Sequence, residues 1–99
     1  MDTTLLHKIQ ATLAHAPVLR AWLFGSFARR QEAAGSDIDI LVQFERNAKI
    51  TLLDYGGIVY ELEQTTGRSV DLVQDTMLKP FARETADRDK ILIYERTAT

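Results

Sequence analysis

Gly25-Ser-Phe-Ala-Arg-Arg-Gln-Glu-Ala-Ala-Gly-Ser-Asp-Ile-Asp-Ile40 is the stretch of sequence that decides how this chain folds. It starts directly after the apolar run VLRAWLF at 18–24, and its last residues open a second apolar run at 37–44. Both runs have the length and composition of short β-strands. We therefore expect a strand, a glycine-serine turn leading into one or two helical turns over 27–33, and a second strand.

The second of these runs begins with two aspartates. Because side chains i and i+2 of a strand point to the same face, Asp37 and Asp39 should lie together, with their carboxylates about 7 Å apart. The opposite face should carry Ile38, Ile40 and Val42. Carboxylate oxygens suit a hard cation such as Mg²⁺. A third carboxylate, Asp71 in the later run SVDLVQ, joins the pair if that strand lies beside the first.

Gly25-Ser26 has the character of a phosphate-binding turn. Glycine allows the backbone to approach a phosphate closely. The start of the following helix directs N–H groups and a partial positive charge toward the same point. Ser26 adds a hydroxyl donor, and Arg29 lies about one helical turn further on, where it could face the same phosphates.

Hydrophobic periodicity outside this stretch predicts the remaining elements. We expect a helix over 3–15 capped by Thr3 or Thr4, a helix over 51–66 ended by Gly67, a strand over 69–74, a helix over 77–86 with Pro80 in its first turn, and a strand or helix end over 91–94. The apolar stripe of the second helix is expected to be Leu52, Leu53, Tyr55, Val59 and Leu62. The order is therefore roughly α-β-α-β-α-β-α-β, an α/β sandwich with a small sheet.

The stretch at 25–40 resembles the signature of the nucleotidyltransferase superfamily that includes DNA polymerase beta, and in particular its minimal nucleotidyltransferase group. That signature is Gly-Ser-x-Ala-Arg-Gly, five variable residues, then Ser-Asp-x-Asp-Leu. The spacing from Gly25 to Asp37 matches it without a gap, and the segment around Asp71 resembles the third carboxylate strand. Arg30 replaces a family glycine, which puts the local backbone geometry in question, and Ile40 replaces a leucine.

The resemblance implies a nucleotidyltransferase fold, a small mixed β-sheet flanked by helices, in a single domain over residues 1–99. Asp37, Asp39 and Asp71 would be catalytic and would bind two Mg²⁺ ions, with Asp71 the candidate to help deprotonate the acceptor. Gly25, Ser26, Arg29 and Ser36 would bind the nucleotide, with ATP as the donor.

The resemblance also implies a biological role. Minimal nucleotidyltransferases are often encoded beside a HEPN-domain ribonuclease toxin, and studied members neutralise that toxin by transferring AMP to one of its tyrosines. Two alternatives stay open. The chain could be an antitoxin that acts by binding alone, or it could be a nucleotidyltransferase for small molecules, although those enzymes usually carry an additional substrate domain.

Composition narrows the range of functions. The 99 residues are 45% hydrophobic and 26% charged with a net charge of −2, which is typical of one globular domain and argues against nucleic-acid binding through a basic face. With no cysteine, thiolate zinc sites and cysteine nucleophiles are excluded. His7 and His15, the two histidines, are expected at the surface. No signal peptide or membrane span is recognisable, so we expect a cytoplasmic protein.

Overall fold

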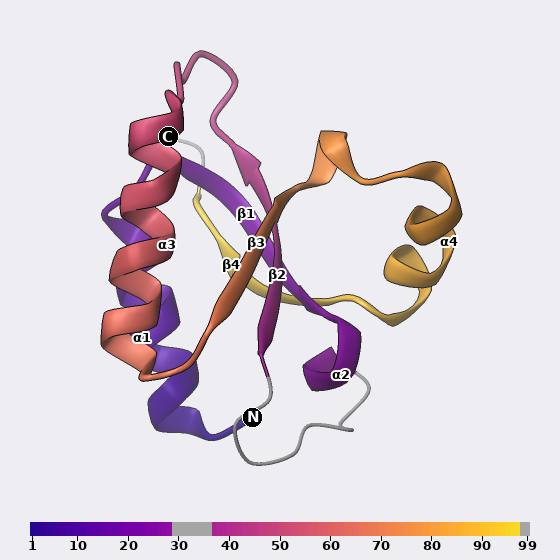
Figure 1. Ribbon diagram of the computed structural model, residues 1–99, viewed down its shortest axis with the longest axis horizontal. Coiled ribbons are helices and arrows are strands. Elements are labelled where there is room, and N and C mark those ends of the chain that lie inside the picture. The colour runs from indigo at the N-terminus through magenta and orange to yellow at the C-terminus, as the bar shows by residue number, and fades with distance from the viewer. Residues whose placement is uncertain (29–36, 98–99) are drawn as a thin grey trace.

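Helices lie on both sides of a four-stranded sheet in the computed structural model, which describes residues 1–28 and 37–97 (Figure 1). The elements are α1 Thr3–Ala14, β1 Val18–Phe24, α2 Gly25–Ala28, β2 Ile38–Phe44, α3 Leu52–Thr66, β3 Val70–Gln74, the 3₁₀ turn η1 Asp75–Met77, α4 Pro80–Asp89 and β4 Ile91–Glu95. Apart from η1, this is the alternating order that the sequence predicts. Among the described residues, no helix is both long enough and apolar enough to cross a membrane.

The sheet is mixed, with the strand order β3-β2-β1-β4. Strand β1 runs antiparallel to both β2 and β4, whereas β2 and β3 run parallel. A parallel pair needs a long crossover, and α3 supplies it between β2 and β3. The same ends of β2 and β3 therefore meet at one edge of the sheet, close to α2.

One face of the sheet forms the hydrophobic core. Ile38, Ile40 and Val42 of β2 are completely buried there, as their alternation predicts, and they pack into one cluster with Leu13 of α1 and Leu62 of α3. Figure 1 shows α1 and α3 side by side over this face. Burial of each large aliphatic side chain contributes about 1.5–3 kcal/mol, so this face dominates the stability of the fold.

The predicted apolar stripe of α3 is wrong at its beginning. Leu52 and Leu53 are 87% and 85% exposed, although the helix itself is present. The side chains that α3 contributes to the hydrophobic cluster are Tyr55, Ile58, Val59 and Leu62. The first turn lies beyond that cluster, and a capping box between Thr51 and Asp54 holds it instead.

Two other helix starts differ from the expected ones. Asp2 caps α1, because its carboxylate accepts the N–H of Thr4 at 3.0 Å, whereas Thr3 or Thr4 was the expected cap. Helix α4 begins at Pro80, not at residue 77, because the residue before a proline avoids helical backbone and Lys79 is extended, with ψ of 147°. Gly67 is confirmed as the cap that ends α3, with φ of +69°.

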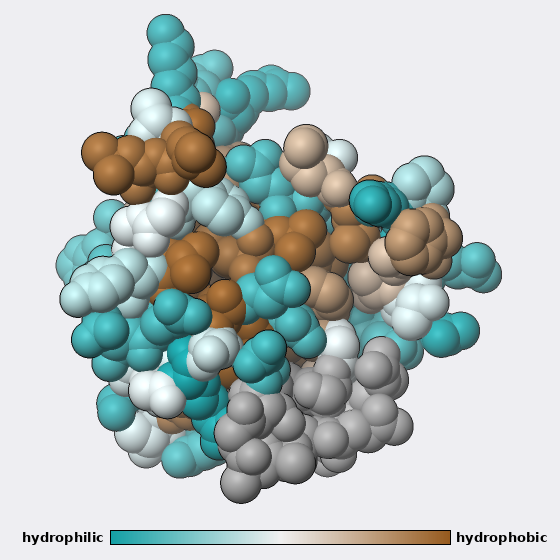
Figure 2. Space-filling view, in the orientation of Figure 1, coloured by the Kyte–Doolittle hydropathy of each residue, from teal (hydrophilic) through white to brown (hydrophobic). Residues whose placement is uncertain are grey.

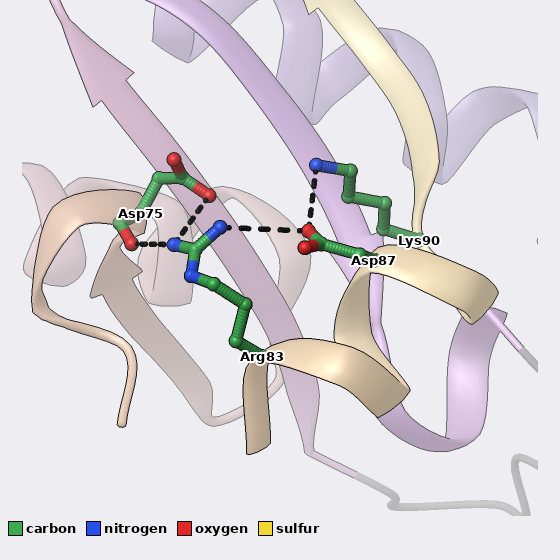
Figure 3. Close-up of polar contacts among 4 residues, drawn as sticks. All are labelled: Asp75, Arg83, Asp87 and Lys90. Carbon is green, nitrogen blue, oxygen red and sulfur yellow. Dashed lines mark hydrogen bonds and ion pairs between the residues drawn. The ribbon is translucent and has the colours of Figure 1, made fainter. Parts of the chain in front are cut away.

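Arg83 connects α4 to the turn that follows β3 (Figure 3). Its guanidinium donates to the backbone carbonyl of Asp75, lies 3.2 Å from the Asp75 carboxylate and lies 3.5 Å from the carboxylate of Asp87. Lys90 contacts the same Asp87 oxygen at 3.0 Å, and its ammonium lies 4.6 Å from the centre of the Trp22 ring. These contacts hold α4 on the opposite side of the sheet from α1 and α3.

Candidate active site

Asp39 and Asp71 are neighbours across the parallel strands β2 and β3. Their Cα atoms are register partners, and adjacent strands lie about 4.8 Å apart. Ile40 and Leu72, the next pair in the register, are buried in the core, so the two aspartates point to the opposite face. The sequence predicted this pair only on the condition that the two strands lie side by side, and they do.

Asp37 lies one residue before β2 and is exposed. Within residues 1–28 and 37–97, no three histidine, aspartate or glutamate side chains lie close enough together to hold a metal ion. The structure thus brings Asp39 and Asp71 together, and it does not gather Asp37 with them into a closed cluster. A role for all three as metal ligands stays a prediction.

Gly25 leaves the space that the Asp39 side chain occupies. Its φ of +67° is a left-handed conformation that favours glycine. A Cβ atom at this position would collide with the Asp39 carboxylate and would lie 3.1 Å from its Cγ. Strand pairing brings the two residues together, because Phe24 is the register partner of Asp39. The sequence predicted Gly25 for close approach to a phosphate, and it did not predict this contact.

The other predicted nucleotide-binding residues are only partly visible. Ser26 lies at the junction of β1 and a helix, as expected, but α2 begins at Gly25 and not at Phe27, and the rest of the expected helix to residue 33 lies outside the described residues. Arg29 and Ser36, and the unusual Arg30 between them, lie outside the described residues. Their roles stay predictions.

Tyr55 of α3 lies near the site, whereas the sequence placed it only in the apolar stripe of that helix. Burial raises the pKa of the Tyr55 phenol above 10.0, and the negative charge of Asp71 raises it further. The phenol is therefore close enough to Asp71 for the carboxylate charge to oppose its ionisation, and it stays neutral at physiological pH. No sequence pattern links these residues, because their proximity depends on how α3 packs against β3.

A cavity of about 350 Å³ opens between Gly25 and α4, on the side of the sheet away from α1 and α3. Its walls include Phe24, Leu78, Phe81 and Asp89. This volume lies in the range of small-molecule sites. The cavity adjoins the glycine that contacts Asp39, so a bound nucleotide could reach the carboxylates from it.

The carboxylates fit a magnesium ion by their chemistry. Asp39 and Asp71 offer hard oxygen donors from adjacent strands, and two carboxylates this close repel each other less when a cation lies between them. Asp71 is exposed, so its oxygens are also open to a ligand. Together with a glycine turn suited to phosphates, this donor set can support the binding of a nucleoside triphosphate and the displacement of its pyrophosphate.

Comparisons with known proteins agree with this chemistry. The chain is 39% identical over 77 residues to a candidate protein adenylyltransferase of Methanocaldococcus jannaschii, covering 78% of this chain and 81% of the relative. The solved structure of a candidate minimal nucleotidyltransferase is 38% identical, with a TM-score of 0.75 over 92% of this chain and 95% of that chain.

A third similarity concerns the fold alone, because the identity is 18%. The match is a chain from the complex of a tri-AMPylated HEPN toxin of Shewanella oneidensis with an MNT antitoxin. Its TM-score is 0.72 over 97% of this chain and 74% of that chain. From residue 7 to residue 99 the sequence also matches the family described as Polymerase beta, Nucleotidyltransferase. The mixed sheet, the paired aspartates and these matches together place this chain in the polymerase beta nucleotidyltransferase family.

Proposed function

We propose that this chain transfers AMP from ATP to a tyrosine hydroxyl of a partner HEPN ribonuclease toxin and thereby acts as its antitoxin. The observation that carries the proposal is the pairing of Asp39 with Asp71 beside Gly25. Protein adenylyl transfer is supported by the M. jannaschii relative, which is named for that activity. The partner is supported by the S. oneidensis complex, in which the toxin carries AMP groups.

The reaction is a displacement at the α-phosphorus of ATP. The acceptor oxygen forms a bond to that phosphorus, the bond from the phosphorus to the bridging oxygen of pyrophosphate breaks, and pyrophosphate leaves. When bound, Mg²⁺ would supply charge stabilisation for the attacking and leaving oxygens. In this proposal Asp71, exposed near the start of β3, accepts the proton of the acceptor hydroxyl.

The residues at the start of α2 would bind the rest of the triphosphate. Gly25 and Ser26 present backbone N–H groups at the end of β1, where charge-assisted hydrogen bonds to phosphate oxygens are strong. We assign Arg29 and Ser36 to the same phosphates, and Asp37 to the metal together with Asp39. ATP is the donor in this proposal.

Mass spectrometry of the HEPN partner after incubation with this protein, Mg²⁺ and ATP tests the proposal. The wild type should add the mass of one or more AMP residues to a tyrosine peptide. The Asp39→Asn/Asp71→Asn variant should add none, and Glu61→Gln, which alters an exposed carboxylate of α3 outside the site, should behave as the wild type.

The same samples separate catalysis from simple binding when the ribonuclease activity of the partner is assayed. Catalytic neutralisation requires that the Asp39→Asn/Asp71→Asn variant leave the toxin active. If that variant silences the toxin as well as the wild type does, and no AMP is added by either protein, the chain acts by contact alone and the proposal is wrong.

A further inference from the structure

An apolar groove of about 400 Å³ lies between the start of α3 and strand β3. Its walls include Ile50, Leu52, Tyr55, Leu72, Val73 and Met77. Leu52 and Met77 are 87% and 72% exposed, so the rim is apolar and in contact with solvent. Figure 2 shows this apolar surface continuing between α3 and β3. Nothing in the fold or the proposed chemistry explains why these side chains are exposed.

The groove runs along β3 from the residue that follows Asp71. Leu72 follows Asp71 directly on β3, and Gln74, at the far end of the strand, also lines the groove. Three residues of strand span about 10 Å. Tyr55 forms part of the wall. The side chains of Leu72 and Asp71 point to opposite faces of the sheet, so a chain that runs along the outer edge of β3 would meet both the groove and Asp71.

Within residues 1–28 and 37–97, strand β3 is also an edge of the sheet, because it pairs with β2 on one side and with no strand on the other. The backbone N–H of Val70 donates to the carboxylate of Glu63 at 2.9 Å, which closes the outer edge at the first residue of the strand. Backbone groups of alternate residues face the same side, so the N–H of Leu72 should face outward in the groove as well. An edge with outward backbone groups can pair with another extended chain.

We propose that this groove docks the acceptor protein, with an extended segment of the acceptor lying along the outer edge of β3. The segment has apolar side chains that fill the groove, and its acceptor hydroxyl lies at Asp71. This inference rests on the proposed function, because it supplies the binding site for the protein that receives AMP. The occupant follows from continuity, since a segment paired to β3 at Leu72 already extends to the reacting atoms. An apolar residue should therefore occur within about three positions of the modified residue.

Leu52→Asp/Met77→Asp is the test variant, and Leu53→Asp is its matched control. Leu53 is 85% exposed and adjoins Leu52, but it lines a different depression, beside Lys49 and Gly57. The measurements are the Kd of the HEPN partner by calorimetry, the KM for that partner and for ATP, and amide hydrogen exchange over residues 70–74. The double variant should raise Kd and acceptor KM about tenfold or more, with the KM for ATP and the kcat at saturating partner unchanged. Binding of the partner should also slow exchange over 70–74 in the wild type.

Three results would overturn the inference. The double variant could bind and modify the partner as the wild type does. Leu53→Asp could weaken binding equally, which would mean that the added charge matters and the groove does not. Light scattering could show a wild-type dimer that the double variant converts to a monomer, which would make the groove a self-association surface. If the wild type binds the partner but transfers no AMP, the proposed function fails, while the comparison of Kd values still decides the docking site. If the wild type neither binds nor modifies the partner, both proposals fail.

Discussion

Substitution of two glycines by alanine separates backbone strain from damage to the site. Gly25 and Gly67 have nearly the same φ, +67° and +69°, and an alanine is strained at both positions. The left-handed conformation costs about 1–2 kcal/mol for an L-residue, and a restricted unfolded chain returns about 0.4–1 kcal/mol of that. Each variant should therefore lose about 1 kcal/mol of unfolding free energy, which is about 4–8 °C in melting temperature for a domain of this size.

The two sites differ in what the new methyl group meets. At Gly67 no atom of the described residues other than its chain neighbours lies within 4 Å of the added Cβ, whereas at Gly25 the Cβ collides with the Asp39 carboxylate. Movement of Asp39 to a less favourable rotamer adds about 0.5–1.5 kcal/mol to the destabilisation. A displacement of about 1 Å in a catalytic group can lower the rate about a hundredfold. Gly25→Ala should therefore lose most of its AMP-transfer activity, and Gly67→Ala should keep it.

Urea unfolding and AMP transfer measured on the same preparations decide the matter. The unfolding free energies should be similar, with Gly25→Ala the lower, and the activities should differ by about a hundredfold. If both variants keep the activity of the wild type, the argument that Gly25 makes room for Asp39 is refuted. If both lose activity to the same extent, the argument also fails, because activity then simply follows stability.

Four further predictions concern the Asp71–Tyr55 pair, the start of α3 and the attachment of α4. Asp71→Asn should lower the pKa of Tyr55, because it removes a negative charge that opposes ionisation of the phenol. Ultraviolet titration of tyrosinate measures the change, with Tyr55→Phe to assign the signal, and an unaltered titration would contradict the proximity of the two side chains. Thr51→Ala should cost about 1 kcal/mol in urea unfolding through loss of the cap of α3. Hydrogen bonds from Thr51 lower the pKa of Asp54 below 3.8. The stability that Asp54 adds is therefore present above pH 3.8 and is lost as the pH falls through the depressed pKa. The unfolding free energy of an Asp54→Asn variant should differ from that of the wild type at pH 7, and the two values should converge in acid. Arg83→Gln should lower the unfolding free energy by about 1–2 kcal/mol and raise the KM for ATP, because α4 loses its attachment to Asp75. An unchanged KM for ATP would mean that α4 does not position the nucleotide.

Local patterns in the sequence were sufficient to predict the order of the helices and strands and one face of the core. The alternation of Ile38, Ile40 and Val42 fixes which side of β2 is buried, and Gly67 marks the end of α3. These predictions depend only on residues a few positions apart. The exposure of Leu52 could not be predicted in this way, because helical periodicity does not say where the neighbouring core ends.

The candidate site was predictable in its residue types and less so in its geometry. The spacing of Gly25, Asp37 and Asp39 indicated phosphate and metal chemistry. The register that puts Asp71 next to Asp39, and the contact between Gly25 and the Asp39 carboxylate, depend on strand pairing between distant segments. The ties of Arg83 to Asp75 and Asp87 depend on the path of the chain after β3, which no local pattern specifies.

The parallel crossover through α3 also sets when the protein can become active during its synthesis. Gly25 and Asp39 can come together as soon as β1 and β2 have paired, but Asp71 reaches them only after α3 has returned the chain to the start of the sheet. Contacts that close such long loops tend to form late in folding. A nascent chain that has emerged from the ribosome only as far as Thr66 therefore has Asp39 but lacks Asp71 and the whole of β3. Under the proposed function, protection from the toxin would begin only when β3 has been released and paired, and any pause in translation before that point would lengthen the interval without an active antitoxin.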